Sequence, residues 1–507
     1  MADVPASVVE GRSLGIFALG ASLHHTLSFI KAQPLLFPKI EMSYSQSEPL
    51  SVPPMINLPA NGIRLRFDAT EQRLRLIEVT KFGKSPLVYK DQDIVSPSST
   101  TGPTFKHVYQ LFGPTTPGEY LPAQSGKEGE YSLSYPGISF SFPIRPGASF
   151  ARADWASQVS VLSSSACGPA RAMAIFHGES WPAARKVLYT SEMPFPRAPL
   201  PPGIRDGAPR EIEAVHIHGE CLVELQRKDA PSFWLTIGET TAQDLLAELG
   251  PPDTTHPKKK PTGPARPAGS GSRRPSAAAH NRPLEVGKGE SSEEEEEAEW
   301  EEEEEEGTVV LDVETDLGTF WNYYGHGLDV LVGPPTFSTP RGPKPFNPDS
   351  GLPNMESLGA VADARNHPTV SQIKLHGNVP GSYQFQRHRR LRWTMEDVPA
   401  PDGEGAVDLD SEMKFAEIQR YLRGVYGGRY TSPEEERRLQ LPMVLNRGWG
   451  ESPSVSGSTE LLGGWEDGGG KGRKGEEGKT FEVELYGFRG FVFEVLKTGD
   501  VSAVTIY

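Results

Sequence analysis

The chain has 507 residues, a formal net charge of -16 and 36% hydrophobic residues. A single run, residues 293–306, holds twelve glutamates, so the charge says little about a folded surface and gives no support to nucleic-acid binding. The two cysteines, Cys167 and Cys221, lie far apart, which excludes a disulfide-built fold and is typical of a reducing compartment. No apolar stretch approaches the roughly 20 residues of a membrane-spanning helix. For this length we expect about three domains.

The chain opens with residues 1–12, which we expect to be a disordered lead. An apolar patch follows at Leu14 to Leu23, but Gly15 and Gly20 interrupt it and it runs directly into a helical pattern, so we expect no secretory signal. That first helix is predicted because apolar side chains recur at i, i+4 and i+7, namely Leu23, Leu27 and Ile30.

The stretch Gly62 to Val79 shows a strand pattern that returns three more times. After Gly62 apolar and charged residues alternate up to Phe67, and a polar turn leads back through Leu74 and Leu76, which predicts a hairpin with one apolar face. A lone hairpin is marginal in water, so it needs a covering layer. A glycine opens a similar apolar strand at Gly137, Gly327 and Gly490. We interpret these as homologous units.

An amphipathic helix is predicted before each of these hairpins. The three later helices cover residues 105–112, 245–249 and 415–425, and each stops at a glycine: Gly113, Gly250 and Gly427. Thr240 or Thr241 is a plausible N-cap of the third helix. The predicted fold class is therefore α+β, with tandem helix-plus-antiparallel-sheet units whose helices cover the apolar face.

These units are expected to form about three lobes, interrupted by long insertions. The first lobe covers residues 13–210, the second 211–400 and the third 401–507. A disordered insertion at 254–307 has a basic half followed by the glutamate run, and a Pro/Gly-rich loop at 334–366 and a Gly-rich loop at 447–479 are the others. Further strands are expected at 159–162, 172–176, 215–217, 222–225 and 233–237, and a loop at 190–211.

The motifs of enzymes are incomplete in this chain. Lys479-Thr480 resembles the end of a phosphate-binding loop, but the required earlier glycine is missing and a strand follows. Gly178-Glu179-Ser180-Trp181 lacks the second glycine of a nucleophile elbow. His216 and His218 alternate onto one strand face, where a solvent-facing pair is favoured over a metal site because no third ligand falls nearby. We therefore expect no catalytic, cofactor or metal site.

Two kinds of motif suggest binding instead. Pro117-Gly118-Glu119-Tyr120 and Pro380-Gly381-Ser382-Tyr383 predict either a turn with a packed aromatic or an exposed tyrosine loop for a partner. A basic stretch predicts either a solvated strand face or a contact with phospholipid head groups or an acidic partner; it consists of Arg387, Arg389, Arg390 and Arg392. Ser291 and Ser292 precede the glutamates, so they are candidate phosphorylation sites or part of a plain solubilising spacer.

Several stretches resemble the phagosome assembly factor 1 family. The similar blocks lie in the family's order over roughly residues 13–430 and 480–507: MSYSQSEPLSVPPMINLPANGIRLRFDATEQRLRLIEV at 42–79, LFGPTTPGEY at 111–120, GISFSF at 137–142, NYYGHGLDVL at 322–331, KLHGNVPGSYQF at 374–385 and FEVLKTGDVSAVTIY at 493–507. The long insertions at 254–307 and 447–479 depart from the family pattern.

The resemblance implies a non-catalytic adaptor or scaffold in autophagy. It implies a complex with a β-propeller protein of the breast-carcinoma-amplified-sequence type, which binds phosphoinositides, and a cytoplasmic protein recruited through that partner to phagophore or trans-Golgi membranes. It brings no cofactor, small-molecule substrate or nucleic acid. The alternatives are a factor of trans-Golgi to plasma membrane transport, a direct phospholipid-binding module that uses the basic residues 387–392 or 258–274, and a hydrolase in a groove between lobes.

Overall fold

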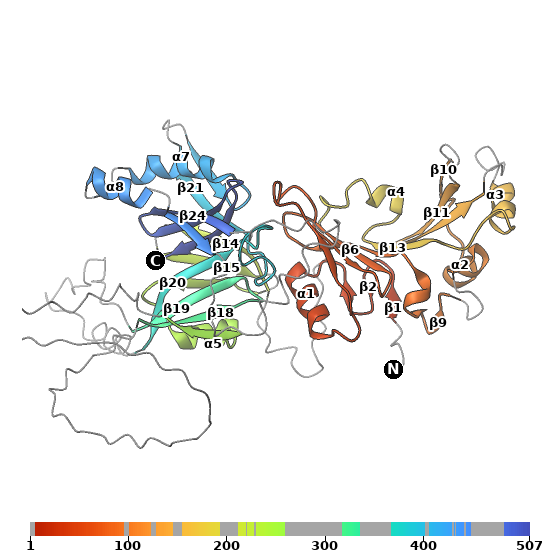
Figure 1. Ribbon diagram of the computed structural model, residues 1–507, viewed down its shortest axis with the longest axis horizontal. Helices are drawn as coiled ribbons and strands as arrows, with labels where there is room; N and C mark the ends of the chain where they lie inside the picture. The colour runs from red at the N-terminus through yellow and green to blue at the C-terminus, as the bar shows by residue number, and fades with distance from the viewer. Residues whose placement is uncertain are drawn as a thin grey trace, which may run out of the picture.

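The computed structural model shows two lobes that lie side by side (Figure 1). It describes residues 6–95, 101–122, 128–145, 155–192, 211–219, 221–227, 230–258, 317–334, 367–400, 405–427, 430, 432–440, 443–447 and 481–507. Each lobe is built from one five-stranded and one eight-stranded sheet. We call residues 6–192 the N-terminal lobe and residues 211–507 the C-terminal lobe.

In the N-terminal lobe the five-stranded sheet has the order β3-β2-β1-β8-β9 and the eight-stranded sheet the order β10-β11-β12-β13-β7-β6-β5-β4. In chain order the elements are β1 (Ala6–Val9), β2 (Ser13–Leu14), β3 (Phe17–Ala18), α1 (Leu23–Ala32), β4 (Glu41–Ser43), β5 (Met55–Leu58), β6 (Ile63–Phe67), β7 (Leu74–Val79), the 3-10 helix η1 (Phe82–Lys84), β8 (Leu87–Tyr89), β9 (Gln92–Asp93), α2 (Phe105–Phe112), β10 (Glu119–Leu121), β11 (Gly129–Tyr135), β12 (Ile138–Ile144), α3 (Trp155–Leu162), β13 (Ala172–Phe176) and α4 (Trp181–Ala184).

The C-terminal lobe repeats this plan, with sheets β16-β15-β14-β21-β22 and β17-β18-β19-β20-β26-β25-β24-β23. Its elements are β14 (Ile212–His218), β15 (Leu222–Arg227), β16 (Phe233–Thr236), α5 (Ala242–Leu249), β17 (Thr254–Pro257), β18 (Thr319–Tyr323), β19 (Leu328–Gly333), β20 (Thr369–His376), β21 (Trp393–Pro399), β22 (Ala406–Asp410), α7 (Phe415–Tyr426), α8 (Pro433–Gln440), β23 (Met443–Arg447), β24 (Phe481–Phe488), β25 (Phe491–Leu496) and β26 (Val501–Ile506). Hence α1 corresponds to α5, α2 to α7, and β8 to β21.

The repeat rests on four glycines at one structural position. Gly62, Gly137, Gly327 and Gly490 have φ angles of 67°, 78°, 79° and 83°, and each precedes the third strand of a four-stranded meander. A left-handed residue suits the tight turn there, which only glycine enters without strain. At Gly327 an added Cβ would also lie 2.4 Å from the backbone oxygen of Arg389. The homologous units predicted from the sequence are confirmed.

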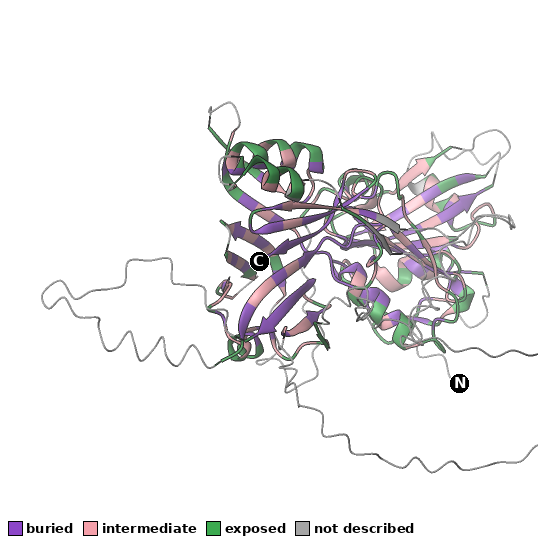
Figure 2. Ribbon diagram, turned by 60° about the vertical axis from the view of Figure 1, so that its left-hand side comes forward, coloured by how far each residue is buried: buried purple, intermediate pink, exposed green. Residues whose placement is uncertain are grey.

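The four predicted helices are confirmed as α1, α2, α5 and α7, and so is the α+β fold class. Thr241 is the N-cap of α5, where its side chain accepts from the Asp244 backbone N–H and the Asp244 carboxylate accepts from Thr241 in return. Leu245 and Leu249 of α5, and Phe415, Ile418 and Leu422 of α7, are buried. Each lobe has its own apolar core between helices and sheets, and the strands carry most of the buried residues (Figure 2).

Three expectations about local structure are wrong. Residues 6–9, expected in a disordered lead, form β1, because they pair in parallel with β8 some 80 positions along the chain. Residues 159–162, expected as a strand, belong to helix α3. Residues 254–257, placed in the insertion, form β17, which pairs with β18. For β17 the partner strand is distant in sequence and leaves no local signal.

The C-terminal lobe groups its residues differently from the division at residue 400. Strand β20 pairs with β26, and one hydrophobic cluster joins Val215 and Ile373 with Phe493 and Ile506. Residues 211–400 and 401–507 therefore share a sheet and a core. The rest of the predicted insertions, from 259 to 307, 335 to 366 and 448 to 479, lies outside the described residues. Among the helices that the structure describes, none is long and apolar enough to cross a membrane.

Candidate functional site

The loop between β20 and β21, residues 377–392, joins the two lobes, and we call it the junction loop. Its Phe385 is 8% exposed and belongs to the core of the N-terminal lobe, where its ring meets that of Tyr44 edge-on at 4.9 Å. In the opposite direction, the partly buried Leu50 of the N-terminal lobe packs against a cluster of Val379, Val483 and Leu496. Each lobe thus packs an apolar side chain against the other.

A reciprocal amide pair lies at the centre of this junction. Gln72 Nε2 donates to the Asn378 backbone oxygen at 2.8 Å, and Asn378 Nδ2 donates to Gln72 Oε1 at 2.7 Å. Both residues are at most 3% exposed and have positive φ angles of 54° and 44°. Asn378 Oδ1 also accepts from the Gln386 backbone N–H. Buried amides are costly unless bonded, so this pair ties the contact to one geometry.

A buried ion cluster lies beside it. Glu211 Oε1 lies 3.0 Å from Arg389 Nε of the junction loop and 2.6 Å from Arg73 Nη1 of the N-terminal lobe. Burial lowers the pKa of Arg389 to about 10. Although burial by itself raises the pKa of Glu211, the guanidinium groups of Arg389 and Arg73 hold that pKa below its usual value. The Arg389 guanidinium and the half-buried Glu211 carboxylate stay charged at neutral pH, and Glu211 bridges the lobes by contacting both arginines.

Arg390 and Arg392 also face the N-terminal lobe. Arg390 Nε donates to the backbone oxygen of Thr70, and its Nη2 donates to Glu412 at 3.1 Å. Arg392 Nε lies 3.0 Å from the same Glu412, and its Nη1 lies 3.3 Å from Glu71 of the N-terminal lobe. These contacts hold the turn between β6 and β7 against the junction loop.

The structure therefore corrects the interpretation of the basic stretch as one exposed surface on a strand. Arg389 and Arg390 are 5% and 4% exposed, and the stretch is a loop. Arg387 is exposed and stacks over the Tyr324 ring at 5.3 Å, while Arg392 is half-buried.

The two Pro-Gly motifs do not come together. Pro380 is buried in the junction, Gly381 has a φ of 92°, and Tyr383 is 46% exposed. Pro117, Gly118 and Tyr120 lie where the chain enters β10, at the end of the N-terminal lobe far from the other lobe (Figure 1). There the Gly118 backbone N–H donates to the Tyr131 hydroxyl at 2.7 Å. Ser291 and Ser292 lie outside the described residues.

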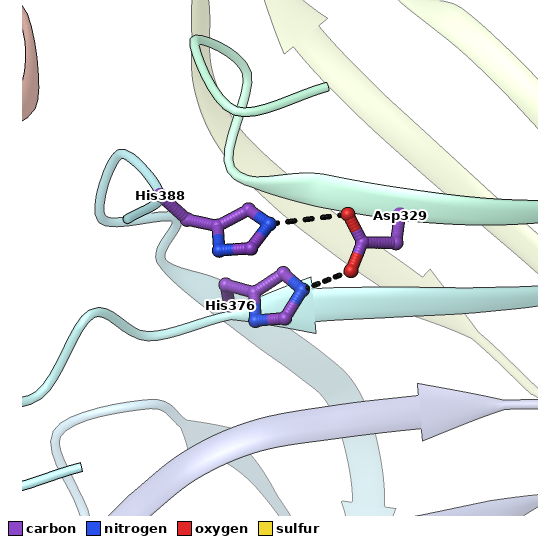
Figure 3. A group of neighbouring side chains, drawn as sticks. All are labelled: Asp329, His376 and His388. Atoms are coloured by element: carbon purple, nitrogen blue, oxygen red, sulfur yellow. Dashed lines mark hydrogen bonds and ion pairs between the residues drawn. The ribbon is translucent and has the colours of Figure 1, made fainter. Parts of the chain in front are cut away.

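A buried triad supports the junction loop from the C-terminal side (Figure 3). Asp329 of β19 accepts from His376, at the end of β20, at 2.7 Å, and from His388 of the loop at 3.1 Å, one carboxylate oxygen for each Nε2. The two imidazole rings stack with centroids 3.7 Å apart and planes 12° apart. Burial lowers the pKa of His376 to about 4, and the neighbouring His388 adds to this.

Asp329 remains the anion of this triad. Burial by itself raises the pKa of Asp329, but the hydrogen bonds from the two histidines bring it below its usual value. An ionised carboxylate only accepts hydrogen bonds, so both imidazoles donate through Nε2–H. The triad thereby fixes the end of β20 and the junction loop against β19.

The triad is also the group of described residues whose donor atoms, all within 4.8 Å of one another, best match a metal site. Two histidines and an aspartate are ligands that zinc accepts, but structural zinc requires four. The stacked rings also direct their Nε2 atoms side by side at the carboxylate instead of toward one point. The contacts that the structure shows are those of a hydrogen-bonded triad.

Sequence reasoning missed the triad and the amide pair. Asp329 lies 47 and 59 positions from the two histidines, and Gln72 lies 306 positions from Asn378, so no local spacing reveals them. The predicted His216 and His218 do share a strand face, with ring centroids 6.3 Å apart. Each lies near a carboxylate, Glu396 and Glu224 respectively.

Comparison with known proteins identifies the same family that the sequence blocks resemble. The family model of phagosome assembly factor 1 matches residues 13–262 and 357–507. A PHAF1 protein of Arabidopsis thaliana is 30% identical over 258 residues, or 49% of this chain and 57% of that protein. A Caenorhabditis elegans PHAF1 protein is 33% identical over 26% of this chain and 32% of its own length, and a Drosophila melanogaster PHAF1 protein is 34% identical over 25% and 28%.

The matched stretch thus spans little more than half of the Arabidopsis relative and about a third of the other two. No solved structure matches significantly.

Proposed function

Since the chain belongs to the phagosome assembly factor 1 family, we propose that it is a non-catalytic adaptor in phagophore assembly during autophagy. It acts in complex with a β-propeller protein that binds phosphoinositides, and it reaches the membrane through that partner. A role in trans-Golgi to plasma membrane transport is the alternative traffic step for the same adaptor.

The junction is the observation that carries this proposal. Five ionisable side chains are buried and hydrogen-bonded within the protein: Arg389, Arg390 and the triad of Asp329, His376 and His388. They therefore fix two lobes into one body instead of lining an open site. A rigid pair of lobes presents a continuous composite surface, which suits a scaffold, because interface groups held in place need little ordering on binding.

The same observation weakens the direct phospholipid-binding alternative for residues 387–392, whereas residues 259–274 lie outside the described residues. Of the four predicted arginines, Arg389 and Arg390 are buried, so their guanidinium groups are not free for lipid head groups. Arg387 and Arg392 remain accessible, yet both also bond within the protein. Two such arginines give a small electrostatic attraction, of about 1 kcal/mol per basic residue near an anionic surface.

Reconstitution tests the adaptor function. Purified full-length chain is mixed with a phosphoinositide-binding β-propeller protein of the breast-carcinoma-amplified-sequence type and analysed by size-exclusion chromatography. The complex is expected with the wild type and with Val187→Asp, a change at a 48% exposed position that makes none of the junction contacts described above. It is expected to weaken with Phe385→Glu, which forces a charge into the core of the N-terminal lobe.

Liposome flotation with phosphatidylinositol 3-phosphate then separates direct from indirect membrane binding. The chain is expected to float only when the propeller is present. Flotation of the chain alone would favour the lipid-binding alternative, and failure of the wild type to form any complex with the propeller would refute the adaptor proposal.

A further inference from the structure

The C-terminal lobe carries an open groove between its five-stranded sheet and the end of α7. The groove has a volume of about 540 Å³, within the range of roughly 300–1,000 Å³ typical of ligand sites. Its lining mixes polar and apolar groups, and the apolar ones include Ile217, Leu222, Met395, Leu422, Val425 and Phe491. Figure 1 shows α7 beside β21, and both elements supply lining residues.

The internal repeat shows what fills the same place in the other lobe. Phe105 and Phe415 are the first residues of the corresponding helices α2 and α7, so Phe112 corresponds to Leu422. The parallel pairs Ala6–Leu87 and Val215–Trp393 align β8 with β21, so Tyr89 corresponds to Met395.

In the N-terminal lobe two aromatic rings close this space. The rings of Tyr89 and Phe112 stack with centroids 4.2 Å apart, and Tyr89 is only 4% exposed. Lys90 follows directly and places its ammonium group 4.7 Å from the centroid of the Tyr89 ring. The C-terminal lobe has Met395 and Leu422 at the corresponding positions, and both line the groove, together with Tyr426 from the additional turn of α7.

The rim of the groove is acidic. A β-bulge in β21 interrupts the pairing between Met395 and Val398 and places Glu396 and Asp397 in exposed positions among the lining residues. Asp397 has a φ of 57°, so the backbone is turned specifically at this point. The lining contains these two carboxylates and His218, and no lysine or arginine. Glu396 also lies 2.7 Å from His216 Nδ1, and the Asp397 side chain is the second acidic group of the rim.

We propose that this groove is a peptide-binding site for a partner segment with an aromatic side chain next to a lysine or arginine. The ring occupies the space that the Tyr89 ring fills in the other lobe, and the neighbouring cation meets Glu396 and Asp397. Aromatic rings bury a large apolar area and commonly anchor such segments in pockets. The inference is independent of the adaptor function and of the propeller partner.

A peptide library provides the probe. Random seven-residue peptides displayed on phage are selected on the purified full-length chain, with an unrelated protein as background, and the enriched sequences are synthesised with a fluorescent label. We expect enrichment of Phe, Tyr or Trp directly beside Lys or Arg, and affinity that falls as salt rises, because the cation meets exposed carboxylates.

Two groove variants and one matched control locate the binding. Val425→Trp fills the groove and is expected to weaken the peptides at least tenfold. The double change Glu396→Gln and Asp397→Asn keeps the shape and removes the charge, and is expected to weaken them three- to tenfold. Glu417→Lys alters an exposed residue of the same helix outside the lining, and is expected to leave affinity unchanged.

Cys221 gives an independent readout, because it is exposed in the groove lining. Burial raises the pKa of the other thiol, Cys167, to about 11, so alkylation at neutral pH reports mainly on Cys221. Bound peptide is expected to slow that alkylation.

The proposal is overturned if no peptide is enriched over background, or if the enriched peptides lack the aromatic-basic pair. It is equally overturned if they bind both groove variants as tightly as the wild type. The charge-removing double change lies at the exposed rim, so it keeps the test decisive if Val425→Trp perturbs the fold.

Discussion

Replacing His376 with asparagine should make the protein less sensitive to mild acid. His376 is 3% exposed, and burial, with a contribution from His388, lowers its pKa from 6.5 to about 4. The folded state therefore keeps this imidazole neutral, whereas the unfolded chain takes up a proton near pH 6.5. The sign follows directly: the stability contributed by neutral His376 is fully present above pH 6.5 and is lost as the pH falls toward 4.

The magnitude follows from the same shift. One pKa unit corresponds to about 1.36 kcal/mol, so between pH 7.5 and pH 4.5 the wild type should lose about 2.5 kcal/mol more of its unfolding free energy than His376→Asn. Asp329 does not obscure this window. Its pKa is lowered as well, so its contribution is present above the usual carboxylate range and is lost only at lower pH.

Urea unfolding at pH 7.5, 6.5, 5.5 and 4.5, followed by tryptophan fluorescence, measures the effect. The asparagine variant should be the less stable protein at pH 7.5, because it loses the stacked ring contact with His388, and the difference should shrink or reverse at pH 4.5. His25→Asn, at an exposed position of α1, is the control and should follow the wild type. Parallel curves for wild type and His376→Asn would refute the account of the triad.

Three further predictions test the repeat, the junction and the cap of α5. Gly327→Ala should lower the free energy of unfolding by about 2 kcal/mol or more in urea titrations, because its Cβ would lie 2.4 Å from a backbone oxygen. The control Gly219→Ala, at a φ of 69° with open space around it, should lower it by about 1 kcal/mol. Equal losses would contradict the steric argument. Gln72→Ala and Asn378→Ala should each lower the free energy of unfolding by about 1–3 kcal/mol, because each leaves a buried amide unpaired. A double-mutant cycle should show coupling between them. Additive losses would mean that the pair does not act as a unit. Thr241→Ala should lower stability by about 1 kcal/mol through loss of the α5 cap, measured by thermal unfolding, and an unchanged midpoint would contradict that role.

The units of the fold were predictable because their signals are local. A glycine before an alternating strand, and a helix that stops at a glycine, both lie within about ten residues of the element that they define. Gly62 and Gly490 therefore identified equivalent turns although they lie at opposite ends of the chain. Strand β1 was missed because it is short and one of its two partners, β8, lies far along the chain, although the other, β2, is local.

The junction was not predictable, because each of its charges has a distant partner. Arg389 donates to a backbone oxygen 177 positions away and Arg390 to one 320 positions away. In the sequence the arginines resemble an exposed basic surface, since an unpaired guanidinium belongs in solvent. Only the approach of Glu211 and of the turn between β6 and β7 makes burial favourable. The predicted role, binding at an exposed surface, and the observed role, holding the two lobes together, thus involve the same arginines.

The two lobes share one plan but have diverged at the same strand. The connection from β7 to β8 covers only residues 80–86. The corresponding connection from β20 to β21 is the junction loop, residues 377–392, which packs against the other lobe. Immediately after it, β21 carries the bulge that exposes Glu396 and Asp397 beside the open groove. Strand β21 begins at the junction loop and lines the groove at its other end. A ligand in the groove would therefore contact a strand whose position the junction already holds. The repeat unit that contains β21 therefore both holds the lobes together and carries the groove.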